Sequence, residues 1–503
     1  MTQRDAERFV RDIERRLEPL DRAILLSEWR LATGRSRDGA GRWQSRRRRL
    51  LGAPGMLESI RTHQRSEYGG LLGRRLDLLA RATLESRIEQ DPEIVRRRDR
   101  LQSRAAAFRP TWHGRKVNRS VVRRAFRTSA DREERRRAFY AEDPVYGPME
   151  DDLRSLVAAR NDRARAFGYR TYPEFRLSFD RLSVDRLEAL PRESLRRVPA
   201  EMRRRRDAFA EATGESGWYP WDIGYAQQIA GGLPESAFPA DEALRAVYEG
   251  IQGWGFPRSL LRFRVDHHDI PSGGLCLAPD PPRDVRIVVH PGRGGWEDYM
   301  VLFHEVGHAV HSSSIRGPTH LLRWHEGLPG FGGFHEGIGE FFAEIAEKDA
   351  WLRTRKGLSS TQIRDYVAEH RRAPLRVIAY LAGWIQRELD LYLRPQRDPR
   401  EAERRYGRSV MAFDDFTPRS FADSFYIHGP IYATSYFVAT LLRPQLFESV
   451  RNDVGGEAWP NAKIGPWLTR HWFREGSAFD WLPRVREVTG RPFGTRAFNE
   501  AMR

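Results

Sequence analysis

The stretch Val301-Leu-Phe-His-Glu-Val-Gly-His-Ala-Val-His311 places two histidines four residues apart in a largely apolar segment. Residues four apart lie on one face of an α-helix, one turn from each other, so His304 and His308 can direct imidazole nitrogens at one metal ion. Glu305 lies beside that face, where its carboxylate can hold a water bound to the metal. This His-Glu-x-x-His spacing therefore predicts a zinc-binding helix.

A catalytic zinc ion usually has three protein ligands, so one further ligand is required. One class of zinc peptidases, the metzincins, has a glycine and a third histidine at the positions of His311 and Ser314, which argues against that class. A second acidic segment, Gly333-Phe-His-Glu-Gly-Ile-Gly-Glu340, follows in the chain. We expect Glu336 to be the third ligand and Glu340, one turn later, to orient a ligand histidine through its other ring nitrogen.

The remainder of the chain is mostly helical in pattern, because apolar residues recur at helical spacing along residues 7–31, 46–110, 182–209 and 361–450. The first of these segments is either one long helix or a pair bent at Pro19. Only residues 274–278 and 285–290 have the composition of strands, which predicts a small hairpin before the zinc helix. We expect the zinc helix to run from about Trp296 to Ser312, and a second, acidic helix from Phe334 to Trp351.

The chain is strongly basic, with 86 lysines and arginines against 69 acidic residues and a formal net charge of +17. Almost all of the basic residues are arginines. They form runs in helix-like surroundings at residues 46–49, 96–98, 135–137 and 203–206. We interpret these runs as solvated helix faces, and a phosphate-binding surface for nucleic acid is the less favoured alternative.

Cys276 is the only cysteine, which excludes an intrachain disulfide and a multi-cysteine zinc cluster. This fits a reducing, cytoplasmic location. The N-terminus is charged, and no window approaches the roughly eighteen uninterrupted apolar residues of a membrane span, so we expect no membrane partner. We divide the 503 residues into an N-terminal helical scaffold or lid, residues 1–115, and a catalytic region, residues 116–503, which together form one continuous unit.

Two motifs resemble those of known peptidases. The segment from His304 to His311 resembles the metal helix of oligopeptidases related to thimet oligopeptidase and oligoendopeptidase F. Phe334-His-Glu-Gly-Ile-Gly-Glu340 is similar to the Phe-His-Glu-Ala-Ile-Gly-Asp motif of angiotensin-converting enzyme, and Arg160-Asn161 through Tyr172 is similar to a further segment of the oligopeptidases. Both families are gluzincins. The resemblance implies one Zn²⁺ ion bound by His304, His308 and Glu336, with Glu305 as the catalytic base.

The same resemblance implies the fold class: mainly α, a two-lobed helical peptidase fold around a deep substrate channel, with a small β-hairpin or sheet before the zinc helix. Such a channel would admit short peptides, and the strand at Gly274 to Ala278 would pair with the substrate backbone. The spacing from His308 to Glu336 is a few residues longer than in either family, so we expect an inserted loop between the two helices.

Both families also place a histidine and tyrosines beside the site, where they donate hydrogen bonds to the oxyanion. The corresponding candidates here are His428, Tyr432 and Tyr436. We prefer Tyr436, because Tyr436-Phe-Val438 and His428-Gly-Pro430 both resemble the converting-enzyme segment, whereas Tyr432-Ala-Thr434 resembles the oligoendopeptidase one. Without the resemblance, the stretch would be a helix with buried aromatic residues.

The predicted function is a zinc metallopeptidase that hydrolyses short peptides. Two alternatives stay open: a zinc-containing peptide-binding or scaffold protein without turnover, and, less favoured, an arginine-rich nucleic-acid binder. The converting enzyme anchors the substrate C-terminus with a lysine at the position of Tyr426, so endopeptidase and carboxydipeptidase modes are both open. The sequence predicts neither the preferred peptide nor the oligomeric state.

Overall fold

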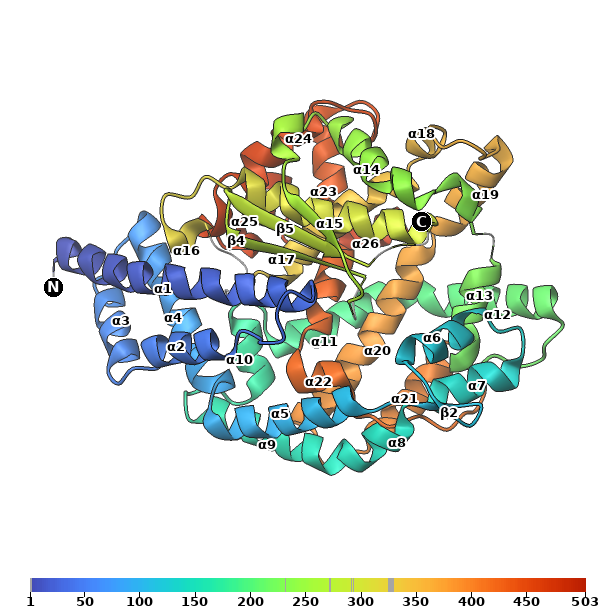
Figure 1. The fold of residues 1–503 in the computed structure, drawn as a ribbon, viewed down its shortest axis with the longest axis horizontal. Coiled ribbons are helices and arrows are strands. Elements are labelled where there is room, and N and C mark those ends of the chain that lie inside the picture. Colours follow the sequence, from blue (N-terminus) through green and yellow to red (C-terminus); the bar gives the residue numbers. More distant parts are fainter. Residues whose placement is uncertain (1, 231, 271–272, 291, 293, 324–329) are drawn as a thin grey trace.

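The computed structural model describes residues 2–230, 232–270, 273–290, 292, 294–323 and 330–503. The chain is mainly helical, as predicted (Figure 1). Its first half contains α1 (Gln3–Ala32), α2 (Gly41–Leu51), α3 (Met56–Gln64), α4 (Gly70–Glu89), α5 (Pro92–Ala107), α6 (Arg119–Thr128), α7 (Arg132–Tyr140), α8 (Asp143–Tyr146), α9 (Glu150–Arg165), α10 (Tyr172–Ser178), α11 (Val184–Ser194), α12 (Val198–Thr213), α13 (Ile223–Ile229) and α14 (Ala243–Gln252).

The second half carries the two predicted motifs and the C-terminal helices. These elements are α15 (Trp296–Ser314), α16 (His320–Arg323), α17 (Gly332–Ala343), α18 (Asp349–Leu352), α19 (Ser360–His370), α20 (Ala373–Leu393), α21 (Pro399–Ser409), α22 (Ser424–His428), α23 (Ala433–Val454), α24 (Ile464–Leu468), α25 (Trp481–Thr489) and α26 (Arg496–Ala501).

The N-terminal segment is one helix, α1, and Pro19 lies inside it. Thr2 caps its first turn by accepting a hydrogen bond from the backbone nitrogen of Asp5, and the Asp5 side chain completes the capping box. The apolar residues at helical spacing that predicted this helix, Val10, Ile13 and Leu17 among them, are buried. Of the two possibilities left by the sequence, a single helix is therefore the correct one.

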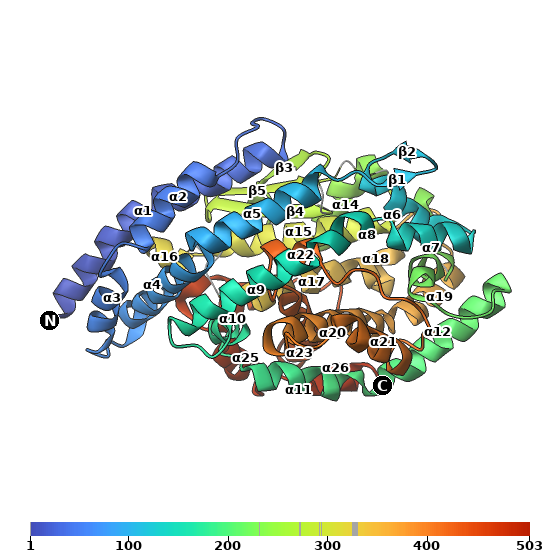
Figure 2. The ribbon, with the colours of Figure 1, turned by 90° about the horizontal axis from the view of Figure 1, so that it is seen from below.

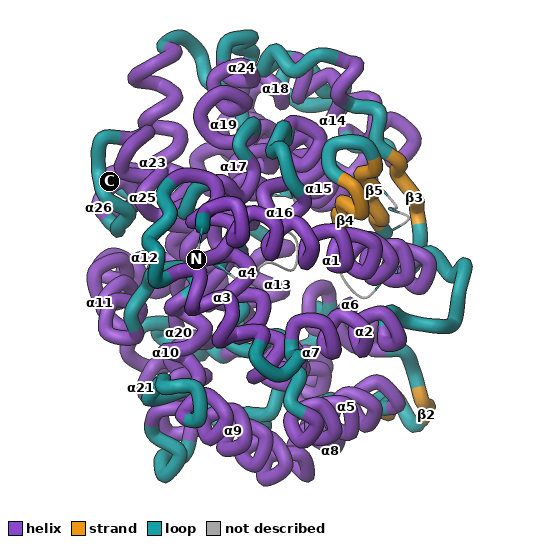
Figure 3. Tube along the Cα trace, turned by 90° about the vertical axis from the view of Figure 1, so that its left-hand side faces the viewer, coloured by secondary structure: helices purple, strands orange, loops and turns teal. Residues whose placement is uncertain are grey.

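A three-stranded sheet precedes α15. The central strand, β5 (Asp284–Val289), pairs antiparallel with β4 (Gly274–Asp280), which confirms the predicted hairpin. β5 also pairs in parallel with β3 (Arg264–His267). The sequence did not predict β3, because three of its four residues are charged or polar; in the structure this strand is only partly buried. β4 is thus an edge strand, and the sheet packs against α15 and α1 (Figures 1 and 3). A two-stranded ribbon, β1 (Thr111–Trp112) and β2 (Arg115–Lys116), lies elsewhere, next to α6 and α7 (Figure 2).

The two motif helices pack together, and α17 also packs along α23. The helix predicted from about Trp296 to Ser312 is confirmed as α15, which ends at Ser314. The predicted second helix ends earlier than expected, at Ala343, and a 3₁₀ turn over Glu344–Glu347 follows. Its continuation to Trp351 was wrong, because Lys348 has an extended backbone and separates this turn from α18.

The longer spacing between the two motifs contains α16, which is attached to α1. Nε2 of His320 lies 2.8 Å from Oδ2 of Asp21, and the hydroxyl of Thr319 donates to Glu14 at 2.7 Å. The part of the chain between α15 and α17 that the structure describes is therefore held against the N-terminal region. Residues 324–329, which include His325 and the start of the expected glycine-rich segment, lie outside the described residues.

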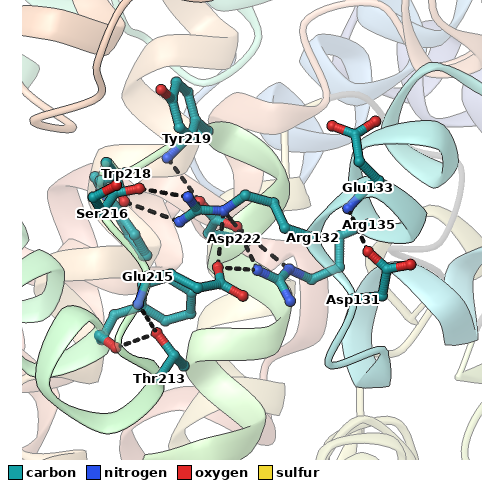
Figure 4. Close-up of polar contacts among 12 residues, drawn as sticks. Asp131, Arg132, Glu133, Arg135, Thr213, Glu215, Ser216, Trp218, Tyr219 and Asp222 are labelled. Carbon is teal, nitrogen blue, oxygen red and sulfur yellow. Dashed lines mark hydrogen bonds and ion pairs between the residues drawn. The ribbon is translucent and has the colours of Figure 1, made fainter.

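The arginine runs are not purely solvated faces, so that interpretation was wrong in part. Arg135 is fully buried and forms ion pairs with Asp222 at 2.9 Å and Glu215 at 2.6 Å (Figure 4). Arg205, from another run, is also buried and forms an ion pair with Glu369 at 2.9 Å. One arginine of each of these two runs faces the interior because successive helical residues point in different directions.

Two cavities lie among the helices, and residues of α6 line both of them. One, of about 1210 Å³, has residues of α5 and α6 on one side and residues of α15 and the sheet on the other. The second, of about 680 Å³, lies among α6, α7, α20 and α22. Both fit the expected channel between two lobes. None of the described helices is both long enough and apolar enough to cross a membrane.

The buried ion pairs of Arg135 generate a stability prediction. Arg135→Met should lower the free energy of unfolding by about 1–3 kcal/mol, because the buried Asp222 would lose one of its two arginine partners and keep only Arg132, at 3.2 Å. Arg136→Met, in the same run but exposed, is the control and should change it by less than about 0.5 kcal/mol. Denaturant unfolding followed by circular dichroism measures the free energy of unfolding of both variants. Equal losses in the two variants would contradict the burial of Arg135.

Candidate metal centre

Three predicted ligands meet between α15 and α17. Nε2 of His304 and Nε2 of His308 are 2.9 Å apart, and Oε2 of Glu336 lies 3.3 Å from the first and 4.0 Å from the second. Ligand atoms bound tetrahedrally to one zinc ion at ordinary bond lengths lie about 3.3 Å from each other. The three atoms therefore fit a single zinc ion, and two histidines with one carboxylate are a common catalytic ligand set.

The ligand carboxylate is fixed from its other side by a tyrosine. The hydroxyl of Tyr432 donates a hydrogen bond to Oε1 of Glu336 at 2.7 Å, which leaves Oε2 facing the histidines. Glu336 itself is buried. An arrangement of this kind orients the carboxylate before a metal binds.

Glu340 lies where its predicted role requires. Its Oε1 is 3.8 Å from Nδ1 of His304, the ring nitrogen that does not face Glu336. The His304 ring can lie against α17 because residue 339 is glycine: a Cβ atom there would be only 2.5 Å from the ring. The position agrees with an orienting role for Glu340, which remains a prediction.

Glu305 is held against the edge strand β4. The backbone nitrogen of Cys276 donates a hydrogen bond to its carboxylate, and a Cβ atom on Gly274 would lie 2.4 Å from the Glu305 side chain. Sequence reasoning placed this strand before the zinc helix but did not assign either residue to the site. The only available signal was a glycine at the start of the strand, since the Cys276 contact is made by the backbone.

Burial and nearby charges shift the pKa values of this group. Burial raises the pKa of Glu305 to about 7, against the opposing effects of the His304 charge and the Cys276 hydrogen bond. Burial lowers the pKa of His304, but the Glu336 carboxylate and the other nearby carboxylates outweigh it and raise this pKa to about 9. The buried carboxylates therefore stabilise positive charge at the His304 ring. They would stabilise a bound metal cation in the same way.

The three predicted oxyanion donors occupy different positions. Tyr432 contacts Glu336, and Tyr436 packs edge-on against Tyr432, with ring centroids 5.5 Å apart. Burial raises the pKa of Tyr436 above its ordinary value, and the charge of Glu336 adds to the increase. His428 lies at the end of α22 beside Phe425, and among the described residues no hydrogen bond or ion pair joins it to the three ligands.

A cavity of about 370 Å³ opens beside the ligand carboxylate. Glu336, Tyr432 and Cys276 line it, together with Arg176 and residues 330–333. His311, at the end of the motif, is buried and packs against the rings of Phe334 and Phe473. The centre thus has open space on the side of Tyr432.

Comparison with solved structures finds a protein of the same overall fold. The structure is similar to that of Trypanosoma cruzi metallocarboxypeptidase 1, with a TM-score of 0.68 and 16% sequence identity over 98% of each chain. No family model matches the sequence, and no curated protein matches it. At this identity the likeness shows the fold. Membership of the oligopeptidase or converting-enzyme families remains a prediction.

The geometry generates a metal-binding prediction. Glu336→Ala should weaken zinc binding by about 100-fold or more, because it removes one of three ligands. Glu340→Gln is the control and should weaken binding by at most about 10- to 100-fold, since the three ligands remain. Titration calorimetry against a competing chelator measures both affinities, and an unchanged affinity in Glu336→Ala would transfer the ligand role to Glu340 or Glu344.

Proposed function

We propose that this protein is a zinc-dependent peptidase that hydrolyses peptide bonds in short peptides. The convergence of His304, His308 and Glu336 on one point, with Glu305 fixed beside it, carries the proposal. The likeness of the whole chain to a solved metallocarboxypeptidase supports it. His304, His308 and Glu336 would hold the ion.

When bound, zinc would lower the pKa of its water and polarise the substrate carbonyl. Glu305 would accept the proton of that water, and the Cys276 hydrogen bond that holds its carboxylate near His304 supports this role. The same carboxyl group would then pass the proton to the leaving amine. Tyr436, with Tyr432 or His428, would donate hydrogen bonds to the oxyanion.

The surroundings of the centre support a peptide substrate. The edge strand β4 lies directly beside Glu305, and an extended peptide can add to such an edge through its backbone, without strict side-chain preference. The cavity of about 1210 Å³ is lined by α5 and α6 on one side and by α15 and the sheet on the other, which favours short peptides over folded proteins. The name of the solved neighbour makes removal of C-terminal residues the first mode to test.

The chemistry assigned to Glu305 is tested by Glu305→Gln. This variant should bind zinc with wild-type stoichiometry but lose at least about 1,000-fold in kcat, because the amide cannot accept the proton. Metal analysis and mass spectrometry of products from a library of short peptides measure the two quantities. Full turnover in the variant would refute the role of Glu305, and a zinc-loaded wild type that cleaves no peptide would favour a peptide-binding or scaffold protein.

The placement of Glu305 against β4 is tested at Gly274. Gly274→Ala should lower kcat by about 10- to 100-fold with zinc content unchanged, because its methyl group would push the Glu305 carboxylate aside. Gly273→Ala is the matched control, since a Cβ atom there meets only the Val301 side chain, at 3.1 Å. Equal kcat values for the two variants would show that β4 does not position the base.

A further inference from the structure

The segment between α22 and α23 has an unfavourable backbone conformation next to the metal centre. Ile431 has a φ of +63°, in the left-handed region that a β-branched residue rarely adopts. The next residue, Tyr432, caps α23 and donates its hydroxyl hydrogen to the ligand Glu336. The direction of the Tyr432 side chain therefore depends on keeping Ile431 in this conformation.

A buried arginine holds the first half of this segment. Arg160, on α9, is fully buried and donates from Nη1 to the carbonyl of Tyr426 at 2.8 Å and from Nη2 to the carbonyl of Ile427 at 2.7 Å. These carbonyls belong to the last turn of α22, where a positive charge is also favoured by the helix dipole. Arg160 thus fixes the end of α22.

A buried carboxylate holds the second half. Oε1 of Glu388, on α20, accepts a hydrogen bond from the backbone nitrogen of Ile431 at 2.7 Å. Glu388 is only 2% exposed, and in the described part of the chain no hydrogen bond or ion pair joins it to His304, His308 or Glu336. Without this acceptor, the Ile431 nitrogen would be buried and unpaired in a conformation that is already unfavourable.

We propose that Glu388 is a positioning residue for the metal centre: it holds Ile431 in the left-handed conformation and so directs the Tyr432 hydroxyl at Glu336. The inference rests on the proposed function, because Tyr432 affects catalysis only if Glu336 belongs to the reacting metal centre. The connection consists of two hydrogen bonds: the Ile431 nitrogen donates to Glu388 on α20, and the hydroxyl of the next residue, Tyr432, donates to Glu336. Glu388 acts on the reaction only through this segment.

The test compares three variants on α20. Glu388→Ala should lower kcat by about tenfold or more, with KM and the zinc stoichiometry at saturating zinc nearly unchanged, because peptide and metal still bind but Tyr432 is displaced. Glu388→Gln should restore most of kcat, since its amide oxygen can accept the same hydrogen bond. Asp390→Ala is the matched control: Asp390 is a buried carboxylate on the same helix that pairs with Arg394 at 2.7 Å, away from the segment.

Hydrogen exchange gives a readout that does not require turnover. Glu388→Ala should speed amide exchange in a peptide covering residues 425–435, and Asp390→Ala should leave that exchange unchanged. If Glu388→Ala does not fold, Glu388→Asp, which withdraws the acceptor by one methylene, should show the same two effects. Equal losses of kcat in Glu388→Ala and Asp390→Ala, failure of Glu388→Gln to restore kcat, or unchanged exchange at 425–435 would overturn the inference.

The two proposals fail differently. A zinc-loaded wild type that cleaves no peptide would end the proposed function, while exchange at residues 425–435 would still decide whether Glu388 holds the segment. Conversely, a fully active Glu388→Ala variant would remove the positioning role and leave the peptidase proposal intact.

Discussion

The close packing of α15 against α17 is the contact on which the metal centre depends. Two of the predicted ligands come from one helix and the third from the other, so the helices must approach until the side chains meet. Gly339 allows the His304 ring to lie directly against α17, and Gly307 allows α15 to lie against the Cβ atom of Phe342. Any larger residue at these two positions would separate the ligands, because a Cβ atom there would lie within 2.7 Å of its neighbours.

This packing also concentrates charge in a buried place. Glu305, Glu336 and Glu340 all lie near His304, and buried carboxylates are costly unless a positive charge is close. Burial is the main cause of the raised pKa of Glu305, and the carboxylates around His304 raise the pKa of its imidazole. A divalent cation bound between the imidazoles and Glu336 would balance the charge of these carboxylates, which ties the stability of the centre to its occupancy.

Local spacing made much of the centre predictable. The His304 and His308 pair follows from helix geometry alone, and the helices follow from the period of their apolar residues. Glu336 was chosen from residue type and from a resemblance, and the structure brings it to the histidines. Features that depend on the backbone or on distant residues were not predictable: the Cys276 nitrogen, the strand β3 and the inward-facing Arg135 have no local pattern that marks them.

The difference between local spacing and distant contacts also explains why the predicted oxyanion donors are harder to assign than the predicted ligands. Tyr432 and Tyr436 are one helical turn apart at the start of α23, so the sequence offers both to the centre. Which hydroxyl reaches a reacting carbonyl is decided by how α23 begins, and that is set by Ile431, by Glu388 from α20 and by Arg160 from α9. Residues more than forty positions away in the sequence thus act on the Tyr432 side chain through its neighbour Ile431.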